Sequence, residues 1–371
     1  MWRRRNAIRW RSLAEYAPRG TVRQPSGAVH PAPPRHNGEV APRQTNLALL
    51  VLLSWALASG GLAFAIGAGW DRWVVVAHGA LGLGLLLLAP WKRAIVRRGL
   101  RRQRAGTGAS VALAGLVLLS LASGIAHATG VVRAVGAFTM MQVHVATAVG
   151  AIPFAVWHIV ARPAKPRRTD LSRRTLLRSG VVAAGSLAAF GSVSAVTAAT
   201  GLPGRRTRFT GSYPVAGEDY PVTQWLSDGI ADVDPATWRL TVSSEGRELR
   251  TWSLVELNRV AEPIEGVLDC TGGWFVDETW RAVRLDRVLE AVEGRSVRAV
   301  SATGYSRRFP LADAGRLWVA TGTGKAALSA GHGAPARIVA PGRRGFWWVK
   351  WLVELDVGAT PWWWQPPFPL Q

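Results

Sequence analysis

Histidine is the residue whose placement in this chain first points to chemistry. Four of the seven histidines, His78, His127, His144 and His158, lie inside long apolar runs. An ionisable side chain at membrane depth is costly, so its presence there indicates a functional role. Imidazoles from two facing helices can ligate a haem iron axially, and helices rich in Gly and Ala leave room for the porphyrin. The sequence has no CxxCH motif, which excludes a covalently attached c-type haem.

The other candidate for chemistry is Cys270, the one cysteine among 371 residues. A single cysteine excludes a disulfide scaffold, a zinc finger built from one chain and a thiolate-held iron–sulfur cluster. Cys270 stands at the end of a β-type run, Gly266–Cys270, where a rigid strand can aim the thiol. If its domain is exported, a cysteine without a partner needs an explanation, and metal ligation provides one. A buried structural cysteine is the alternative.

The histidines must be positioned by five uncharged, apolar stretches. These stretches cover 47–70, 73–90, 109–130, 138–160 and 179–200, and the last is richest in Ala, Gly, Ser and Thr. At about 1.5 Å per residue, such a stretch crosses a hydrocarbon core of about 30 Å. The stretches are too long for soluble core helices and too many for a signal peptide. We therefore predict an all-α transmembrane bundle of about five helices.

The positive charge of the chain is confined to this membrane half. Residues 1–200 carry a net charge of +21 and residues 201–371 a net charge of +1. The arm 1–46, the loop 91–108 and the segment 161–178 hold most of the basic residues, so the positive-inside rule places them in the cytoplasm. Five crossings then put the C-terminal half outside. Membrane topology thus explains the positive charge without a nucleic-acid partner. The arm 1–46, which is rich in Pro and Arg, is predicted to be disordered.

Depth separates the histidines into two groups. His78, His127 and His144 fall in the outer leaflet, whereas His158 lies 14 residues beyond His144 and about 21 Å deeper. The layout resembles small membrane cytochromes b, whose two-haem members carry two His about 14 residues apart on each of two helices. The position 14 residues after His78 is Lys92, so an inner haem lacks a partner.

We therefore expect one haem b near the outer face, with His78 and His144 as axial ligands. His127 is the substitute ligand, or it contacts a haem propionate or a quinone. The alternative is that these histidines only bond between helices or lie at the membrane interface.

A twin-arginine pattern precedes the last apolar stretch. Residues Ser172–Arg178 read SRRTLLR and are followed by the mildly apolar helix 179–200. The segment 164–200 resembles the export signal that moves folded proteins, often with a cofactor already inserted. The alternative is that paired arginines only mark a cytoplasmic loop, as they do at Arg97–Arg98.

The C-terminal half, 201–371, is long enough for one substantial core. Short β-type runs alternate with turns and two helical patches, which indicates a mixed α+β domain. The predicted strands are Trp238–Ser243, Gly266–Cys270, Val297–Ala302, Leu317–Ala320, Arg337–Ala340 and Val349–Val357, and the predicted helices are Ser253–Val260 and Leu285–Val292.

Several ordered motifs in this half resemble the molybdopterin domain of the sulfite oxidase family. They include Gly266–Trp274 (GVLDCTGGW), Gly331–Pro341 (GHGAPARIVAP) and the later Val349–Trp351 (VKW), within a resemblance that covers about 220–360. In that family a G-x-P-x-R segment is followed by a K-W pair about a dozen residues later.

The resemblance implies that Cys270 ligates molybdenum, which on a dithiolene accepts a soft thiolate. It also implies a set of residues that hold the pterin and its phosphate, with Tyr305 catalytic at the mouth of the site. The expected cofactor-binding residues are Thr271, His332, Gly333, Arg337, Trp348, Val349 and Lys350. For Arg343 and Arg344 the alternative interpretation, a solvated charge on the surface, stays open.

Two departures from sulfite oxidases affect the expected substrate. The Asn- and Arg-rich stretch that follows their cysteine is replaced by the uncharged Thr271–Val276, and no immunoglobulin-like dimerisation domain follows the matched region. Both features look more like the bacterial periplasmic methionine sulfoxide reductase branch, which works with a separate haem-binding membrane subunit.

The sequence as a whole predicts a molybdenum oxidoreductase anchored in a bacterial cell membrane. The bundle 47–163 would carry haem b, 164–200 would be signal and fifth helix, and 201–371 would be an extracytoplasmic α+β domain. A quinone, a quinol or another membrane donor, membrane lipid, and a small-molecule or protein sulfoxide-type substrate are the expected partners. A sulfite-type oxidase and a non-catalytic membrane protein that retains the fold remain the alternatives.

Overall fold

The computed structural model describes residues 42–371 apart from 101–105, 164–166, 217–219, 225–227 and 369–371. The prediction of a disordered arm at 1–46 therefore lies almost wholly outside the described residues, which begin at Pro42.

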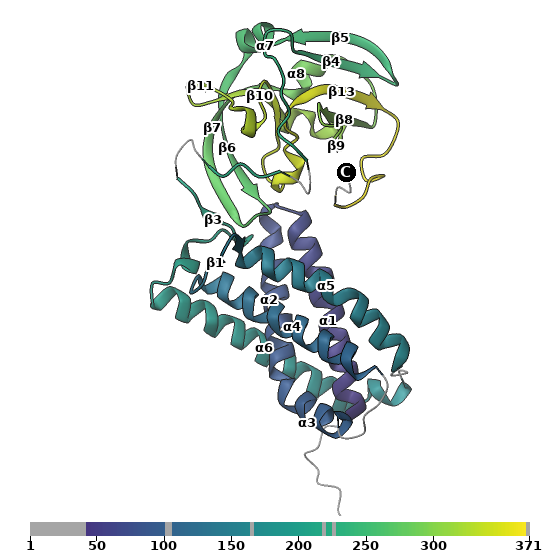
Figure 1. Ribbon diagram of the computed structural model, residues 1–371. Helices are drawn as coiled ribbons and strands as arrows, with labels where there is room; N and C mark the ends of the chain where they lie inside the picture. The colour runs from purple at the N-terminus through teal and green to yellow at the C-terminus, as the bar shows by residue number, and fades with distance from the viewer. Residues whose placement is uncertain (1–41, 101–105, 164–166, 217–219, 225–227, 369–371) are drawn as a thin grey trace, which may run out of the picture. The chain divides into compact units, whose positions relative to one another are not determined.

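The N-terminal half folds into helices that pack alongside one another (Figure 1). α1 packs against α2, α4 against α5, and α6 against α2. The helices are α1 (Pro42–Ala65), α2 (Arg72–Leu87), α3 (Ala89–Leu100), α4 (Thr107–Thr129), α5 (Met140–Ala161) and α6 (Arg173–Ala199).

Four of the described helices, α1, α4, α5 and α6, are long and apolar enough to cross a membrane. The expected second span, 73–90, is broken, because α2 ends at Leu87 and α3 continues at an angle of 42°. Pro90 explains the break, since it has no backbone N–H for the helical ladder and its ring clashes with the carbonyl four residues earlier. If the bent pair is one span, the described helices provide five.

The helix that carries His144 has a well-defined start. The short hairpin of β1 (Ala134–Val135) and β2 (Phe138–Thr139) leads directly into α5. The Thr139 hydroxyl accepts from the Gln142 backbone N–H, and the Gln142 side chain accepts from the Thr139 N–H. This reciprocal capping box fixes the first turn of α5.

The C-terminal half is an α+β domain, as predicted. Its helices are α7 (Leu254–Val260) and α8 (Leu285–Leu289). Its strands are β3 (Tyr213–Pro214), β4 (Arg239–Ser244), β5 (Arg247–Ser253), β6 (Glu262–Cys270), β7 (Trp274–Arg284), β8 (Ser296–Ser301), β9 (Ser306–Pro310), β10 (Trp318–Thr323), β11 (Ala326–Ala327), β12 (Arg337–Val339) and β13 (Leu352–Gly358).

These strands form two sheets (Figure 1). One has the order β11-β10-β7-β3, with β12 also paired to β10 and β6 to β7, and only β3 runs parallel to its neighbour. The other has the order β5-β4-β13-β8-β9 and is antiparallel except for β4 and β13. Large aromatic side chains are fully buried in the core, among them Trp280, Phe309, Trp348 and Trp351.

Two predicted elements are shorter than expected. The helix predicted at Leu285–Val292 ends at Leu289, because Glu290 adopts a positive φ of 56°. The strand predicted at Val349–Val357 begins only at Leu352, since Trp351 has a φ of 50° and turns the chain. A non-glycine residue at positive φ is uncommon and interrupts regular structure.

Candidate functional site

Cys270 is the last residue of β6, in a tight hairpin with β7. It pairs in register with Trp274, and the Gly273 N–H donates to the Cys270 carbonyl at 3.1 Å, with Gly273 at a φ of 90°. The Sγ atom lies 3.3 Å from both the Thr223 hydroxyl and the Gly272 backbone N–H. Burial raises the pKa of the thiol, which favours its protonated form as long as no metal is bound.

The thiol faces a cavity of about 400 Å³. The structure brings most of the predicted site residues to this cavity, namely Cys270, Thr271, Tyr305, His332, Arg337, Trp348 and Lys350. Gly333 and Val349 are not among the lining residues. The Tyr305 hydroxyl already donates to the Phe346 carbonyl, and burial raises the pKa of this phenol.

Arg337 is the most deeply buried cation of the cavity. It is 1% exposed, its Nη1 donates to the His332 carbonyl at 3.0 Å, and its Nη2 donates to the Trp348 carbonyl at 3.3 Å. Burial lowers the pKa of the guanidinium. These two neutral partners orient the side chain but leave its charge uncompensated.

Lys350 is the second cation. Its Nζ donates to the carbonyls of Gly331 at 2.7 Å and Thr223 at 2.8 Å. Burial, and then the charge of Arg337, lowers the pKa of Lys350 from 10.5 to about 7. Gly333 explains why the lysine fits here: at a φ of 102°, a Cβ would come within 2.9 Å of the Lys350 Cβ. Gly333 therefore contributes to the site by having no side chain, which lets Lys350 pack closely against its backbone.

His332 and Val349 are also held by backbone contacts. His332 Nε2 lies 2.8 Å from the Tyr220 carbonyl and Nδ1 lies 2.9 Å from the Ser329 hydroxyl, while the ring packs on Tyr220 at 4.0 Å between centroids. The Val349 carbonyl accepts from the Ile338 N–H at 2.8 Å. Val349 does not line the cavity, but its backbone is hydrogen-bonded to β12, the strand that carries Arg337.

This donor set fits a molybdopterin. Within the described residues, no carboxylate lies within ion-pair distance of Arg337 or Lys350. A fully buried cation, Arg337, beside a half-buried one, Lys350, is unfavourable unless an anion such as a phosphate joins them. The indole Nε1 of Trp274, which also lines the cavity, is a buried donor without a partner in the same part of the chain. The soft sulfur of Cys270 completes a set suited to a thiolate-binding metal on an anionic cofactor.

Arg344 is a residue of the site that sequence reasoning did not find. It is 2% exposed, so a solvated surface charge is wrong for this arginine. Its Nη1 donates to Asp269 Oδ1 at 2.6 Å and its Nη2 to the Cys270 carbonyl at 3.1 Å. The signal was available in Asp269, a carboxylate inside the apolar run of β6 that needs a buried partner.

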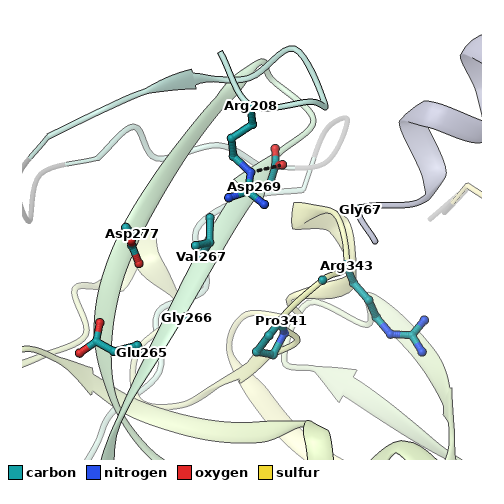
Figure 2. A pocket seen from close by; sticks show the side chains of 10 residues that line it. Gly67, Arg208, Glu265, Gly266, Val267, Asp269, Asp277, Pro341 and Arg343 are labelled. Carbon is teal, nitrogen blue, oxygen red and sulfur yellow. Dashed lines mark hydrogen bonds and ion pairs between the residues drawn. The ribbon is translucent and has the colours of Figure 1, made fainter. Parts of the chain in front are cut away.

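A second cavity, of about 300 Å³, is lined by Asp269 but not by Cys270 (Figure 2). It is lined by Gly67, from the connection between α1 and α2, and by both Asp269 and Arg343. Figure 2 shows Arg208 reaching Asp269, with Nε and Oδ2 at 3.2 Å. Arg343 instead pairs with Asp313 at 2.6 Å, so it does not belong to the Cys270 cavity.

His78 of α2 and His144 of α5 are brought together. Their rings lie edge to face with centroids 5.8 Å apart. His78 Nδ1 is 3.0 Å from the Ala56 carbonyl and His144 Nδ1 is 2.7 Å from the Ser120 carbonyl. A carbonyl only accepts, so each Nδ1 carries the proton and each Nε2 keeps a lone pair for a metal.

Glycines on the neighbouring helices make room for this histidine pair. A Cβ at Gly60 would come within 2.9 Å of His78 Cε1, and a Cβ at Gly124 within 2.9 Å of His144 Nδ1. His158 does not join them, and its Nδ1 lies 3.2 Å from the Ser110 hydroxyl.

His127 lies where α4 contacts the C-terminal domain. Its Nε2 is 2.8 Å from the Gly211 carbonyl, and the Tyr213 hydroxyl donates to its carbonyl. A Cβ at Gly273 would lie 3.3 Å from His127 Cε1, so this ring adjoins the turn that follows Cys270. His127 therefore joins α4 to the cysteine hairpin of the C-terminal domain.

Comparison with known families defines the class of the C-terminal domain. Residues 228–363 match the family model described as the oxidoreductase molybdopterin binding domain. This match covers the region in which the motifs predicted a molybdopterin-binding oxidoreductase domain, and it supports that prediction for this part of the chain.

Several solved structures match the chain. One of them is the sulfane dehydrogenase SoxCD from Paracoccus pantotrophus, with 23% identity and a TM-score of 0.33 over 36% of this chain and 41% of that one. The chain thus spans about two fifths of the length of that structure. A comparison with curated proteins gives no match.

Proposed function

We propose that the chain is a membrane-anchored, molybdopterin-dependent oxidoreductase that exchanges electrons between a haem b in its helices and an oxygen-atom-transfer substrate outside the cytoplasm. In this proposal 47–163 carries the haem and 201–371 the catalysis. The observation that carries it is the single thiol of Cys270, which faces a cavity shared with the uncompensated cations Arg337 and Lys350.

Each part of the cofactor would have its own set of residues. Cys270 would ligate the metal, and Arg337 and Lys350 would bind the phosphate, with His332 at the polar edge of the pterin. When bound, the cofactor supplies a metal that exchanges two electrons and an oxygen atom with a substrate. The protein holds the thiolate in place through Arg344, which fixes the Cys270 carbonyl.

The pair of His78 and His144 is the observation that favours a haem in the helices. His78 and His144 would hold the haem iron through Nε2, because each Nδ1 is already hydrogen-bonded to a carbonyl. A haem between them supplies single-electron transfer, and a quinol or another membrane donor would be its partner. We propose that the twin-arginine segment at Ser172–Arg178 exports the catalytic domain in a folded state.

We favour sulfoxide reduction as the reaction, by analogy with the methionine sulfoxide reductase branch that the sequence resembles. It consumes two electrons and two protons and yields a sulfide and water. Phe64 of α1 and Met141 and Val145 of α5 line the same cavity as Cys270, and Thr271–Val276 carries no charge. Such a wall suits a small uncharged substrate better than an anion such as sulfite.

The first test is the cofactor content of the purified full chain. Metal and pterin analysis of the wild type should give one molybdenum per chain, and Cys270→Ser should lower the molybdenum retained because a hard hydroxyl replaces a soft thiolate. Ser301→Ala, a change in the same cavity that leaves the thiol intact, is the matched control. Equal molybdenum in the wild type and Cys270→Ser would contradict the role of Cys270.

The second test identifies the reaction. Dialkyl sulfoxides, N-oxides and sulfite are added in turn to the full chain in detergent, and haem absorbance is followed. Reoxidation of a chemically reduced haem by sulfoxides supports the proposal. Reduction of an oxidised haem by sulfite would instead favour the sulfite-type oxidase, and a chain without molybdenum and without either response would be the non-catalytic protein.

A further inference from the structure

The C-terminal tail combines strong exposure with a lack of charge. No charged residue follows Asp356, and three tryptophans stand in a row at 362–364. Trp362, Trp363 and Trp364 are 39%, 59% and 71% exposed. Contiguous aromatic surface of this kind marks an interaction site on a soluble domain. Indole rings, with an apolar body and one N–H donor, are enriched where a membrane meets water.

The tail is held against the catalytic domain in one conformation. The Gln365 side chain accepts from the Arg308 N–H at 3.0 Å and donates to the Arg308 carbonyl at 2.8 Å, so it pairs with β9 as a strand residue would. Arg307, 2% exposed, donates through Nη1 to the Pro366 carbonyl at 3.1 Å. These contacts fix the residues that directly follow the tryptophans, and the three indoles lie on the surface.

The end of the tail lies against the first candidate membrane span. Phe368 packs on Phe64 with ring centroids 5.5 Å apart, and it lies 3.9 Å from a Cβ built at Gly61. Phe64 and Gly61 belong to the last two turns of α1. The four steps along the chain from Trp364 to Phe368 span at most about 14 Å. Trp364 is therefore confined to the neighbourhood of that end of α1, and Trp362 and Trp363 directly precede it in the chain.

We propose that the tail, Pro361–Phe368, is a membrane-interface anchor whose three indoles lie among the lipid headgroups of the bilayer that holds α1. The inference depends on α1 spanning a membrane, but it does not depend on the reaction. Trp70 and Trp73, which follow α1 in the chain and are 56% and 70% exposed, extend the aromatic surface at this end of the helix. A belt of this kind stabilises the depth of the helices.

The anchor also contacts the wall of the active site. Phe368 lies 6.4 Å from Phe346, and Phe346 lies 6.3 Å from Phe64, between ring centroids. Phe64 and Phe346 both line the Cys270 cavity. Insertion of the tail would hold these two rings, and with them the cavity, at the membrane surface.

Cysteine labelling of the full chain tests the proposal, because the one native cysteine is buried. Trp363→Cys and, separately, Trp364→Cys are labelled with a fluorophore that responds to polarity, in phosphatidylcholine–phosphatidylglycerol vesicles with or without brominated acyl chains. The matched control is Lys325→Cys, an exposed residue in the turn between β10 and β11. We expect a blue-shifted emission and at least about twofold stronger quenching by bromine at 363 and 364 than at 325.

Two outcomes would overturn the proposal. If the labels at 363 and 364 have the same emission as the label at 325 and are quenched by bromine to the same extent, the tail faces water. Labels that are shielded but not quenched by bromine would show that a protein covers the tail, either a second copy of this chain or another partner. Each measurement is made on oxidised protein without substrate, so a failure here leaves the proposed reaction untouched.

Discussion

Loss of the Arg344 guanidinium should destabilise the catalytic domain more than any other single arginine change near the site. Arg344→Met keeps most of the side-chain volume but removes the partner of Asp269, which is 3% exposed. The remaining donors to that carboxylate are the hydroxyls of Ser212 at 2.6 Å and Thr210 at 2.7 Å, and Arg208 at 3.2 Å. The carboxylate would stay buried with only one, partly exposed, cation.

The expected loss of unfolding free energy follows from the burial of the Arg344–Asp269 ion pair. Breaking a buried ion pair by removing one partner costs about 3–5 kcal/mol. The three remaining donors to Asp269 place the expected loss near the lower limit, about 3 kcal/mol. For a domain of about 150–250 residues, 1 kcal/mol shifts Tm by about 2–4 °C. We therefore expect Arg344→Met to lower the Tm of the catalytic domain by about 6–12 °C.

The assay is thermal unfolding of the full chain in detergent, with Arg343→Met as the matched control. Arg343 forms a partly exposed pair with Asp313, a kind of pair that contributes about 0–1 kcal/mol. The double variant Asp269→Asn with Arg344→Met should be more stable than the sum of the single effects predicts, because no unpaired charge remains. If Arg344→Met lowers Tm no more than Arg343→Met does, the structural role assigned to Arg344 is wrong.

Three further predictions test other parts of the proposal. His144→Ala should abolish a low-spin b-type optical spectrum, whereas His158→Ala should leave it nearly unchanged, because only the former removes an axial imidazole. Lys350 has a pKa of about 7 when folded and 10.5 when unfolded, so the unfolded chain binds more protons between these values. Stability of the cofactor-free domain should then rise with pH from 7 to about 9 in urea titrations, by at most about 1.4 kcal/mol per pH unit, and Lys350→Met should flatten the slope. Replacing Arg173 and Arg174 by Lys should leave the helices before them inserted but keep the catalytic domain protected from external protease, because Lys lacks the planar guanidinium.

The sequence predicted the local features well because they depend on neighbours in the chain. Apolar length predicted the membrane helices. The helix predicted at Ser253–Val260 is α7, and the structure adds a capping box between Ser253 and Glu256 at its start. The position of the thiol at the end of β6 followed from the short β-type run Gly266–Cys270. These signals need no knowledge of distant contacts.

Features that depend on distant contacts were missed. The 11-residue strand β7 contains Asp277 and Glu278, and its pairing with both β6 and β10 outweighs a weak local β preference. The sequence alone leaves a surface position open for Arg344, because Asp269, its partner, lies 75 residues earlier. The contact between Phe368 and Phe64 joins nearly the two ends of the described chain, and no sequence period reports such a pair.

The contacts around His127 argue that the helices do more than anchor the catalytic domain. α4 carries Gly124, which leaves space for the His144 ring, and one turn later it carries His127, which adjoins Gly273. The Gly273 N–H in turn bonds to the carbonyl of Cys270. A displacement of α4 would therefore reach the histidine pair and the cysteine hairpin together, whereas a helix that served only as an anchor would not need to contact either. Because these contacts lie within one chain, electron exchange between the two centres would not depend on an encounter between separate proteins, and its rate should not vary with protein concentration.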